Sequence, residues 1–230
     1  MFVSRRLATI LGTDLNIHPS VLILLAVVIG PSIGEGQQEI TKSIIFAGLI
    51  LASITLHEFG HILMARRLGH ETGDINLNAM GGLATIKSNT MPPKDEFLVS
   101  IAGPAVNLII ASAIFLLFLI VDAADDTLME FVIMTAIATN VVLLVFNMLP
   151  VFPMDGGRVL RSLMAIPFGL YAGTLIALSV GVVILVPMTI YAVTSLNFIL
   201  IFICLFLLTY SVFEFFRIRQ DKHSGKKIQA

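Results

Sequence analysis

The sequence of 230 residues has no tryptophan, only one cysteine and few charged side chains. The single cysteine, Cys204, excludes a disulfide within the chain. Charged residues make up 13% of the sequence, against roughly 25% in a typical soluble domain, while hydrophobic residues make up 57%. The formal net charge is −1, so the composition gives no reason to expect a nucleic-acid partner. These deficits argue against an ordinary soluble domain and favour a chain embedded in lipid.

Long apolar stretches complement this lack of charge. A helix that crosses a bilayer needs about 20 consecutive, mostly apolar residues. Six segments approach this length: residues 17–33, 43–65, 97–121, 128–149, 168–190 and 196–216. We therefore predict an all-α polytopic membrane protein with six transmembrane helices. Residues 1–216 would form the membrane-embedded domain, and residues 217–230 a short basic cytoplasmic tail.

The basic residues predict the orientation of these helices. With six spans, all of the 14 lysine and arginine residues except Lys42 fall on the side that holds both chain ends. The opposite loops hold acidic residues instead: Glu35, Glu39, Asp122, Asp125 and Asp126. Because cytoplasmic loops of membrane proteins are enriched in lysine and arginine, we expect both termini in the cytoplasm.

A further apolar segment, residues 74–86, lies between the second and third predicted spans and is too short to cross the membrane. Its first half alternates apolar and polar residues, which is typical of a strand. Gly81 and Gly82 permit a tight turn or a close backbone contact. We expect a short membrane-associated strand or hairpin that dips toward the active site. An ordinary cytoplasmic loop is the alternative.

The second span contains the motif His57-Glu58-Phe59-Gly60-His61. Residues four positions apart share one face of a helix, so both imidazoles could bind one Zn²⁺, with Glu58 beside them as a general base. Ionisable side chains at lipid depth are energetically costly and are usually functional. The motif therefore predicts a zinc site, and a purely structural histidine pair is the alternative.

A catalytic zinc usually has three protein ligands, so the histidine pair needs a partner. Asp155 follows a run of apolar residues and lies three residues before Arg158, near the cytoplasmic boundary. His57 lies nine residues before Arg66, in the cytoplasmic half of its span. Pro150 and Pro153 prevent a regular helix before it, so we expect an extended or unwound segment there. We favour Asp155 as the third ligand. The alternative is that it caps the amino-terminal end of a helix over residues 156–166.

Asn147 ends the fourth predicted span. Its amide could donate a hydrogen bond to an oxyanion that develops during hydrolysis. It could equally form a hydrogen bond at the helix terminus. The residues alone leave both roles open.

Together these motifs resemble the site-2 protease family of intramembrane metalloproteases. The resemblance extends over most of the chain and rests on four motifs: His57-Glu58-Phe59-Gly60-His61, Gly81-Gly82, Ala102-Gly103-Pro104 with Asn107, and Asn147 to Gly156. It implies hydrolysis of a peptide bond within or near a transmembrane segment of another membrane protein. It also implies one Zn²⁺ per chain and the lipid bilayer as surroundings. The distribution of basic residues places the motif of the second span in the cytoplasmic half of the membrane, so we expect the active site toward the cytoplasmic side.

The resemblance further implies roles for individual residues. His57, His61 and Asp155 would bind zinc, Glu58 would be catalytic, and Asn147 would assist at the transition state. A strand that presents substrate by β-addition would fall within residues 75–86.

Two other functions deserve comparison. Intramembrane histidines and carboxylates also occur in divalent-metal transporters. A conduction path should show polar residues along the whole depth of the membrane, whereas the polar residues here gather on one side. A different class of membrane metalloprotease, which processes lipidated carboxyl termini, fits less well because of the proline-rich segment before Asp155.

Overall fold

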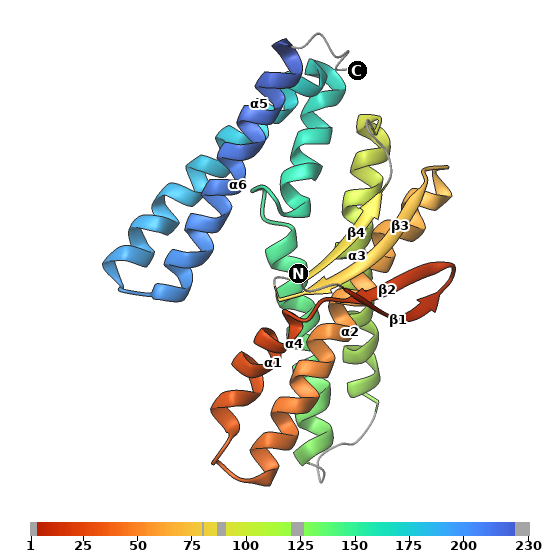
Figure 1. Cartoon of the computed structure of the whole chain (residues 1–230), viewed down its shortest axis with the longest axis vertical. Helices are drawn as coiled ribbons and strands as arrows, with labels where there is room; N and C mark the ends of the chain where they lie inside the picture. The colour runs from red at the N-terminus through yellow and green to blue at the C-terminus, as the bar shows by residue number, and fades with distance from the viewer. Residues whose placement is uncertain (1–3, 80, 87–90, 121–126, 224–230) are drawn as a thin grey trace. The chain divides into compact units, whose positions relative to one another are not determined.

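The computed structural model describes residues 4–79, 81–86, 91–120 and 127–223. Outside these ranges lie tail residues 224–230 and several residues used above to predict orientation: Lys87, Asp122, Asp125, Asp126, Lys226 and Lys227. The elements, in chain order, are β1 (Arg5–Ile10), β2 (Thr13–Ile17), α1 (Val21–Ile29), the 3₁₀ helix η1 (Gly30–Ser32), α2 (Gln37–Arg67), β3 (Thr72–Asn78), β4 (Gly81–Ile86), α3 (Pro93–Phe118), α4 (Thr127–Asn147), α5 (Asp155–Thr194) and α6 (Phe198–His223) (Figure 1).

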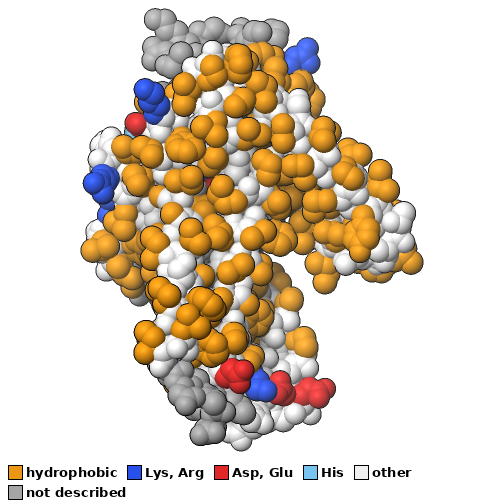
Figure 2. Space-filling view, turned by 180° about the vertical axis from the view of Figure 1, so that it is seen from behind, with side chains coloured by type: hydrophobic (Ala, Val, Ile, Leu, Met, Phe, Trp, Pro, Cys, Tyr) orange, Lys and Arg blue, Asp and Glu red, His pale blue; other side chains and the backbone are white. Residues whose placement is uncertain are grey.

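Five helices among the described residues, α2 to α6, are long and apolar enough to cross a membrane. They overlap the second to sixth predicted spans. Large apolar side chains on their outer faces are exposed, for example Val183 at 72% and Phe213 at 65%. Hydrophobic side chains cover most of the face seen in Figure 2. Such a surface suits lipid contact, and the chain is an integral membrane protein.

The first predicted span, residues 17–33, is not confirmed as a transmembrane helix. Ile17 ends β2, and α1 comprises only nine residues before η1 begins at Gly30. At 1.5 Å per residue α1 is about 14 Å long, less than half of the roughly 30 Å hydrocarbon core. Pro19 disfavours a helical backbone at the preceding residue, which is why the apolar run does not become one long helix.

The chain is mostly helical, as predicted, but it is not all-α beyond one short hairpin, because it contains a four-stranded sheet with the order β1-β2-β3-β4. β1 and β2 are antiparallel, β2 and β3 are parallel, and β3 and β4 are antiparallel. β3 and β4 fall largely in the segment 74–86, where a strand or hairpin was predicted, whereas β1 and β2 were not foreseen. Leu11 and Gly12 turn the chain between β1 and β2 with φ of 50° and 70°.

The chain forms two compact units, and the first comprises Met1–Ser88 and Ala102–Leu144. Its apolar core joins the sheet to α1 and α2 through six buried side chains: Leu15, Val21, Phe59, Ile62, Ile75 and Leu77. Arg66, near the end of α2, donates to the Leu11 carbonyl at 2.5 Å and to the hydroxyls of Thr13 and Thr72 at 2.7 Å. These bonds attach the β1–β2 hairpin to the carboxyl-terminal end of α2.

The second unit comprises Asn89–Ile101 and Val145–Ala230. In it α5 packs along α6, with Val151, Leu185 and Leu207 in one buried cluster. The predicted helix 156–166 and the predicted span 168–190 both lie in α5, which is kinked at Gly169, where φ is 79° and ψ is 160°. Pro167 lies two residues before this kink and lacks the amide hydrogen of a regular helix.

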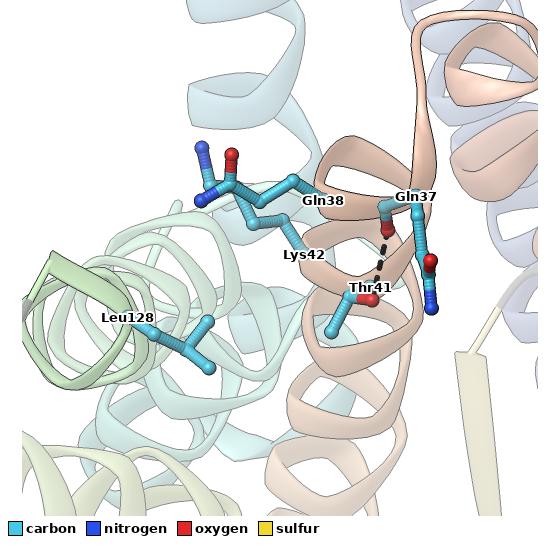
Figure 3. A pocket seen from close by; sticks show the side chains of 5 residues that line it. All are labelled: Gln37, Gln38, Thr41, Lys42 and Leu128. Atoms are coloured by element: carbon cyan, nitrogen blue, oxygen red, sulfur yellow. Dashed lines mark hydrogen bonds between the residues drawn. The ribbon is translucent and has the colours of Figure 1, made fainter.

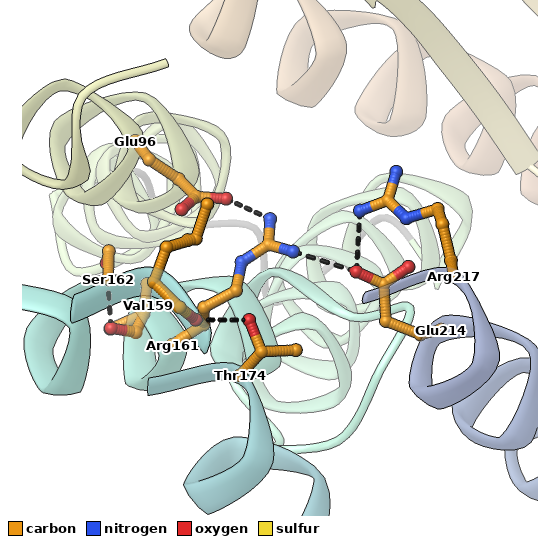
Figure 4. Close-up of polar contacts among 8 residues, drawn as sticks. Glu96, Val159, Arg161, Ser162, Thr174, Glu214 and Arg217 are labelled. Carbon is orange, nitrogen blue, oxygen red and sulfur yellow. Dashed lines mark hydrogen bonds and ion pairs between the residues drawn. The ribbon is translucent and has the colours of Figure 1, made fainter. Parts of the chain in front are cut away.

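Four charged side chains of the second unit form a group that we call the charged cluster (Figure 4). Arg161 of α5 donates to Glu214 of α6 at 2.9 Å and also to Glu96 near the start of α3. Arg217 donates to the same carboxylate oxygen of Glu214 at 2.6 Å. The two positive and two negative charges balance, which reduces the cost of removing them from water.

Candidate metal centre

His57 and His61 lie one turn apart on α2 and are 5% and 6% exposed. Their Nε2 atoms are 3.1 Å apart, and the two rings are nearly perpendicular at 83°. Two nitrogens bound to one tetrahedral Zn²⁺ at about 2.0–2.1 Å would be about 3.3 Å apart. The spacing of the pair therefore fits two ligands of one zinc ion.

Gly103 of α3 leaves room beside this pair. A Cβ atom at Gly103 would lie 2.8 Å from Nε2 of His57 and closer still to Nε2 of His61. Any larger residue would therefore displace the histidines or fill the space that a metal ion needs. Gly60, between the two histidines in sequence, meets the same stretch of α3, because its Cβ would lie 2.7 Å from the Ala102 carbonyl oxygen. The two glycines let α2 and α3 approach closely at the site.

A chain of neutral side chains, which we call the amide chain, fixes the orientation of His57. Asn140 of α4 donates to the backbone carbonyl of Ala136 at 2.9 Å and to the hydroxyl of Ser53 at 3.1 Å. Its oxygen accepts from the Asn107 amide at 2.9 Å, and the Asn107 oxygen lies 2.5 Å from Nδ1 of His57. Asn107 and Asn140 are 0% and 2% exposed.

The direction of these bonds follows from the Ala136 carbonyl, which can only accept. Asn140 must turn its NH₂ group toward that carbonyl, so its oxygen faces Asn107. Asn107 in turn must present its own oxygen to His57, whose Nδ1 therefore carries the proton. In the neutral imidazole with its proton on Nδ1, Nε2 is the nitrogen that can bind a metal.

Glu58 is half-buried on the same turn of α2 and touches the sheet. Its Oε2 accepts a hydrogen bond from the backbone N–H of Ala84 in β4 at 2.8 Å. A Cβ at Gly82 would lie 2.6 Å from Cγ of Glu58, so glycine is needed for this close approach. Within the described sheet β4 pairs only with β3, so its other edge is open. The strand therefore lies directly beside the predicted catalytic carboxylate.

Asn147 and Asp155 belong to the second unit and bracket the segment 148–154, which forms neither helix nor strand. The unwound segment predicted from the two prolines is therefore confirmed. Asn147 is the last residue of α4, and Asp155 is the first residue of α5 and is 6% exposed. The cap position of α5 is held by Met154, without a side-chain capping hydrogen bond.

Sequence reasoning missed the role of several residues of this site. Asn140 and Ser53 were not singled out, and Asn107 was noted only through the family resemblance. Their signal was present, because a buried asparagine in an apolar helix needs a hydrogen-bond partner. The partner itself could not be identified, since Ser53 and Asn140 are 87 residues apart in sequence.

A cavity of about 340 Å³ lies at the other end of α2 (Figure 3). It is lined by Gln37, Gln38, Thr41 and Lys42 of α2 and by Leu128 of α4. Lys42 forms an ion pair with Glu39 at 2.7 Å. His57 lies 15 residues further along the helix, a distance of about 22 Å, so this cavity is separate from the histidine pair.

Comparison with known proteins gives consistent matches. The model of peptidase family M50 matches residues 45–124 and 121–188. A zinc metalloprotease of Methanocaldococcus jannaschii is 32% identical over 207 residues, which are 90% of this chain and 59% of the relative. Stage IV sporulation protein FB of Bacillus subtilis is 29% identical over 52% of this chain and 41% of its own length. The chain thus spans about half the length of these curated relatives.

A solved structure is also similar along nearly its whole length. The site-2 protease from Methanocaldococcus jannaschii matches with a TM-score of 0.67 and 30% sequence identity. The match covers 93% of this chain and 95% of that chain.

Proposed function

Since the chain belongs to peptidase family M50, we propose that it is an intramembrane zinc metalloprotease. It would hydrolyse a peptide bond within or near a transmembrane segment of another membrane protein. The observation that carries this proposal is the pair of buried imidazoles on an apolar helix, with Nε2 atoms 3.1 Å apart and Glu58 on the same turn. The family match favours this function over metal transport.

We infer that His57, His61 and Asp155 bind the zinc ion. The spacing of the two histidines and the proton assigned to Nδ1 of His57 support the first two ligands. Two points support Asp155. It is 6% exposed, and the segment 148–154 before it is unwound, so the backbone there can direct the carboxylate toward a metal ion. Histidine and aspartate are both ordinary zinc ligands, and three of them leave one position for water or substrate.

Zinc, when bound, supplies a Lewis acid that polarises the scissile carbonyl and makes a water molecule more acidic. Glu58 would take the proton of the attacking water and deliver it to the leaving amine. For this, its carboxylate must be within reach of water, which agrees with its half-buried position. Asn147 would donate its amide N–H to the oxyanion that forms on the carbonyl.

We propose that β4 presents the substrate. A transmembrane helix hides its carbonyls in its own hydrogen bonds, so it must unwind before cleavage. An extended segment could recover those bonds at the open edge of β4. The hydrogen bond from Ala84 to Glu58 supports this role, because it brings that edge to the catalytic carboxylate. The hairpin of β3 and β4 would then lie at membrane depth, covered by protein on one side.

The proposed topology keeps both chain ends in the cytoplasm, with residues 1–216 as the membrane domain and 217–230 as its tail. Arg66 supports this, since it bonds the β1–β2 hairpin to the basic end of α2. β2 and α1 would together make the first crossing. At about 3.3 Å per strand residue and 1.5 Å per helix residue they add up to about 30 Å. The active site would then lie toward the cytoplasmic side.

The substitution Glu58→Gln tests the protease function. It keeps the size of the side chain but removes the base, so cleavage should fall by about 10²–10⁴-fold while zinc content stays at that of the wild type. Zinc is measured by elemental analysis of the purified protein. Cleavage is followed by proteomics of membrane-protein fragments in cells that express either form. Glu39→Gln, at the exposed start of the same helix, is the matched control. A Glu58→Gln protein that still produced the wild-type fragments would refute the assignment of the base.

A further inference from the structure

The charged cluster contains a side chain that no step of the proposed chemistry uses, Arg161 of α5. Its side chain is only 14% exposed, and its guanidinium is bound by Glu214 at 2.9 Å and by Glu96 (Figure 4). The two carboxylates come from different helices, α6 and α3. A planar guanidinium held by two carboxylates has little freedom to rotate, so Arg161 occupies a fixed position.

The guanidinium also lies over a third partner. Its central carbon is 5.2 Å from the centroid of the Phe152 ring, within the range of about 6 Å for a cation–π contact. Phe152 is 3% exposed and shares a buried cluster with Ala177 and Leu178 of α5. Arg161 and this cluster together fix the ring of Phe152.

Phe152 belongs to the segment 148–154, which leads into Asp155. The segment's backbone hydrogen bonds, such as those from Val151 to Leu149 and from Met154 to Val151, form turns and not a regular ladder. Side-chain packing therefore also contributes to holding the segment in place. Val151, next to Phe152, is fully buried. The first turn of α5 also rests on the segment, because a Cβ at Gly157 would lie 2.9 Å from the Phe152 nitrogen. A shift of Phe152 would therefore shift the start of α5, where Asp155 lies.

We propose that Arg161 is a positioning residue for Asp155. By fixing Phe152, it fixes the segment that directs the Asp155 carboxylate toward the zinc ion. This inference rests on the proposed function, because Asp155 must be a zinc ligand for the effect to reach the metal. The rival explanation is that Arg161 only ties helices of the second unit together and leaves zinc binding unaffected.

The substitution Arg161→Lys separates the two explanations. Lysine keeps the charge but loses the planar fork that serves two carboxylates and lies flat on a ring. We expect the zinc dissociation constant of the full-length protein, measured by competition with a chelator, to rise by about tenfold. Excess zinc should restore the cleavage rate of the variant. Arg158→Lys, one turn earlier on α5 and outside the charged cluster, is the matched control and should bind zinc like the wild type.

A second variant, Phe152→Leu, removes the ring and leaves the ion pairs in place. It should weaken zinc binding to a similar degree. The double variant should bind zinc only slightly more weakly than either single variant, because both changes act through one contact. Unchanged zinc affinity in both folded single variants, with only a lower unfolding temperature, would overturn the inference.

Asp155→Ala distinguishes this failure from a failure of the proposed function. If it loses zinc while Arg161→Lys and Phe152→Leu retain it, the positioning role alone is wrong. If Asp155→Ala binds zinc like the wild type, the ligand assignment is wrong and the positioning role falls with it.

Discussion

Two buried polar networks of this protein differ in chemistry. The amide chain consists of Ser53, Asn140 and Asn107, whose side chains carry no charge, and ends at His57; none of the four is more than 5% exposed. The charged cluster consists of Glu96, Arg161, Glu214 and Arg217 and reaches solvent through Arg217, whose side chain is 54% exposed. The amide chain ends at the predicted zinc ligand His57. The charged cluster surrounds Arg161, which supports the segment before the other predicted ligand, Asp155.

The difference follows from the cost of removing charges from water. A buried ion costs several kcal/mol even after the protein relaxes, whereas a buried amide costs about 1–3 kcal/mol and recovers this through hydrogen bonds. Asn107 can therefore set the tautomer of His57 deep in an apolar helix bundle without adding a charge. Charged side chains occur instead in the charged cluster, where positive and negative charges balance and where Arg217 is exposed to solvent.

Removing one charge from the charged cluster should have the largest effect on stability. Glu214→Gln leaves Arg161 with one carboxylate fewer, and breaking a buried ion pair in this way costs about 3–5 kcal/mol. Denaturant unfolding in mild detergent measures the loss. Glu39→Gln, whose side chain is 49% exposed, is the control and should change stability little. If Glu214→Gln lowered the free energy of unfolding by less than about 1 kcal/mol, the charged cluster would behave like a surface ion pair. The contrast between buried and exposed charges would then disappear.

Breaking the amide chain should affect zinc more than stability. Asn107→Leu keeps a similar volume but removes the acceptor for Nδ1 of His57, so the tautomer is no longer fixed. The zinc dissociation constant should rise by about 10–100-fold, as expected when the group that orients a metal-binding histidine is lost. Chelator competition gives this value. Ser53→Ala, at the far end of the same chain, should change it much less. Wild-type affinity in Asn107→Leu would show that the amide chain has no influence on the metal.

The exposed member of the charged cluster should matter least. Arg217→Gln removes an ion pair to Glu214 but leaves Arg161 in place, and exposed ion pairs contribute about 0–1 kcal/mol. We expect a change of unfolding free energy below about 1 kcal/mol, measured by the same denaturant titration. A loss as large as that of Glu214→Gln would place Arg217 in the buried part of the network.

The sequence predicted the parts of the site that depend on local spacing. The four-residue spacing of His57 and His61 on a helix, and the two prolines before Asp155, describe neighbours along the chain, and the structure bears out both local geometries. The lack of charge and the long apolar runs predicted the membrane helices α2 to α6 in the same way.

The parts that could not be predicted depend on contacts between distant residues. β2 pairs with β3 through Leu15 and Ile75, 60 residues apart, and its last residue, Ile17, was assigned to the predicted first span. The bonds from Arg161 to Glu214 and Glu96 cross 53 and 65 residues. The role of Asn147 stays a prediction, because its chemistry fits both a helix terminus and an oxyanion donor.

The most direct test of the central claim is zinc K-edge X-ray absorption on the purified full-length protein and on Asp155→Ala. The account predicts that the wild type binds one zinc per chain with two imidazole nitrogens and oxygen ligands. Asp155→Ala should lose most of this zinc, since one of three protein ligands is gone. Stoichiometric zinc with an unchanged spectrum in Asp155→Ala would contradict the assignment of a site built from His57, His61 and Asp155.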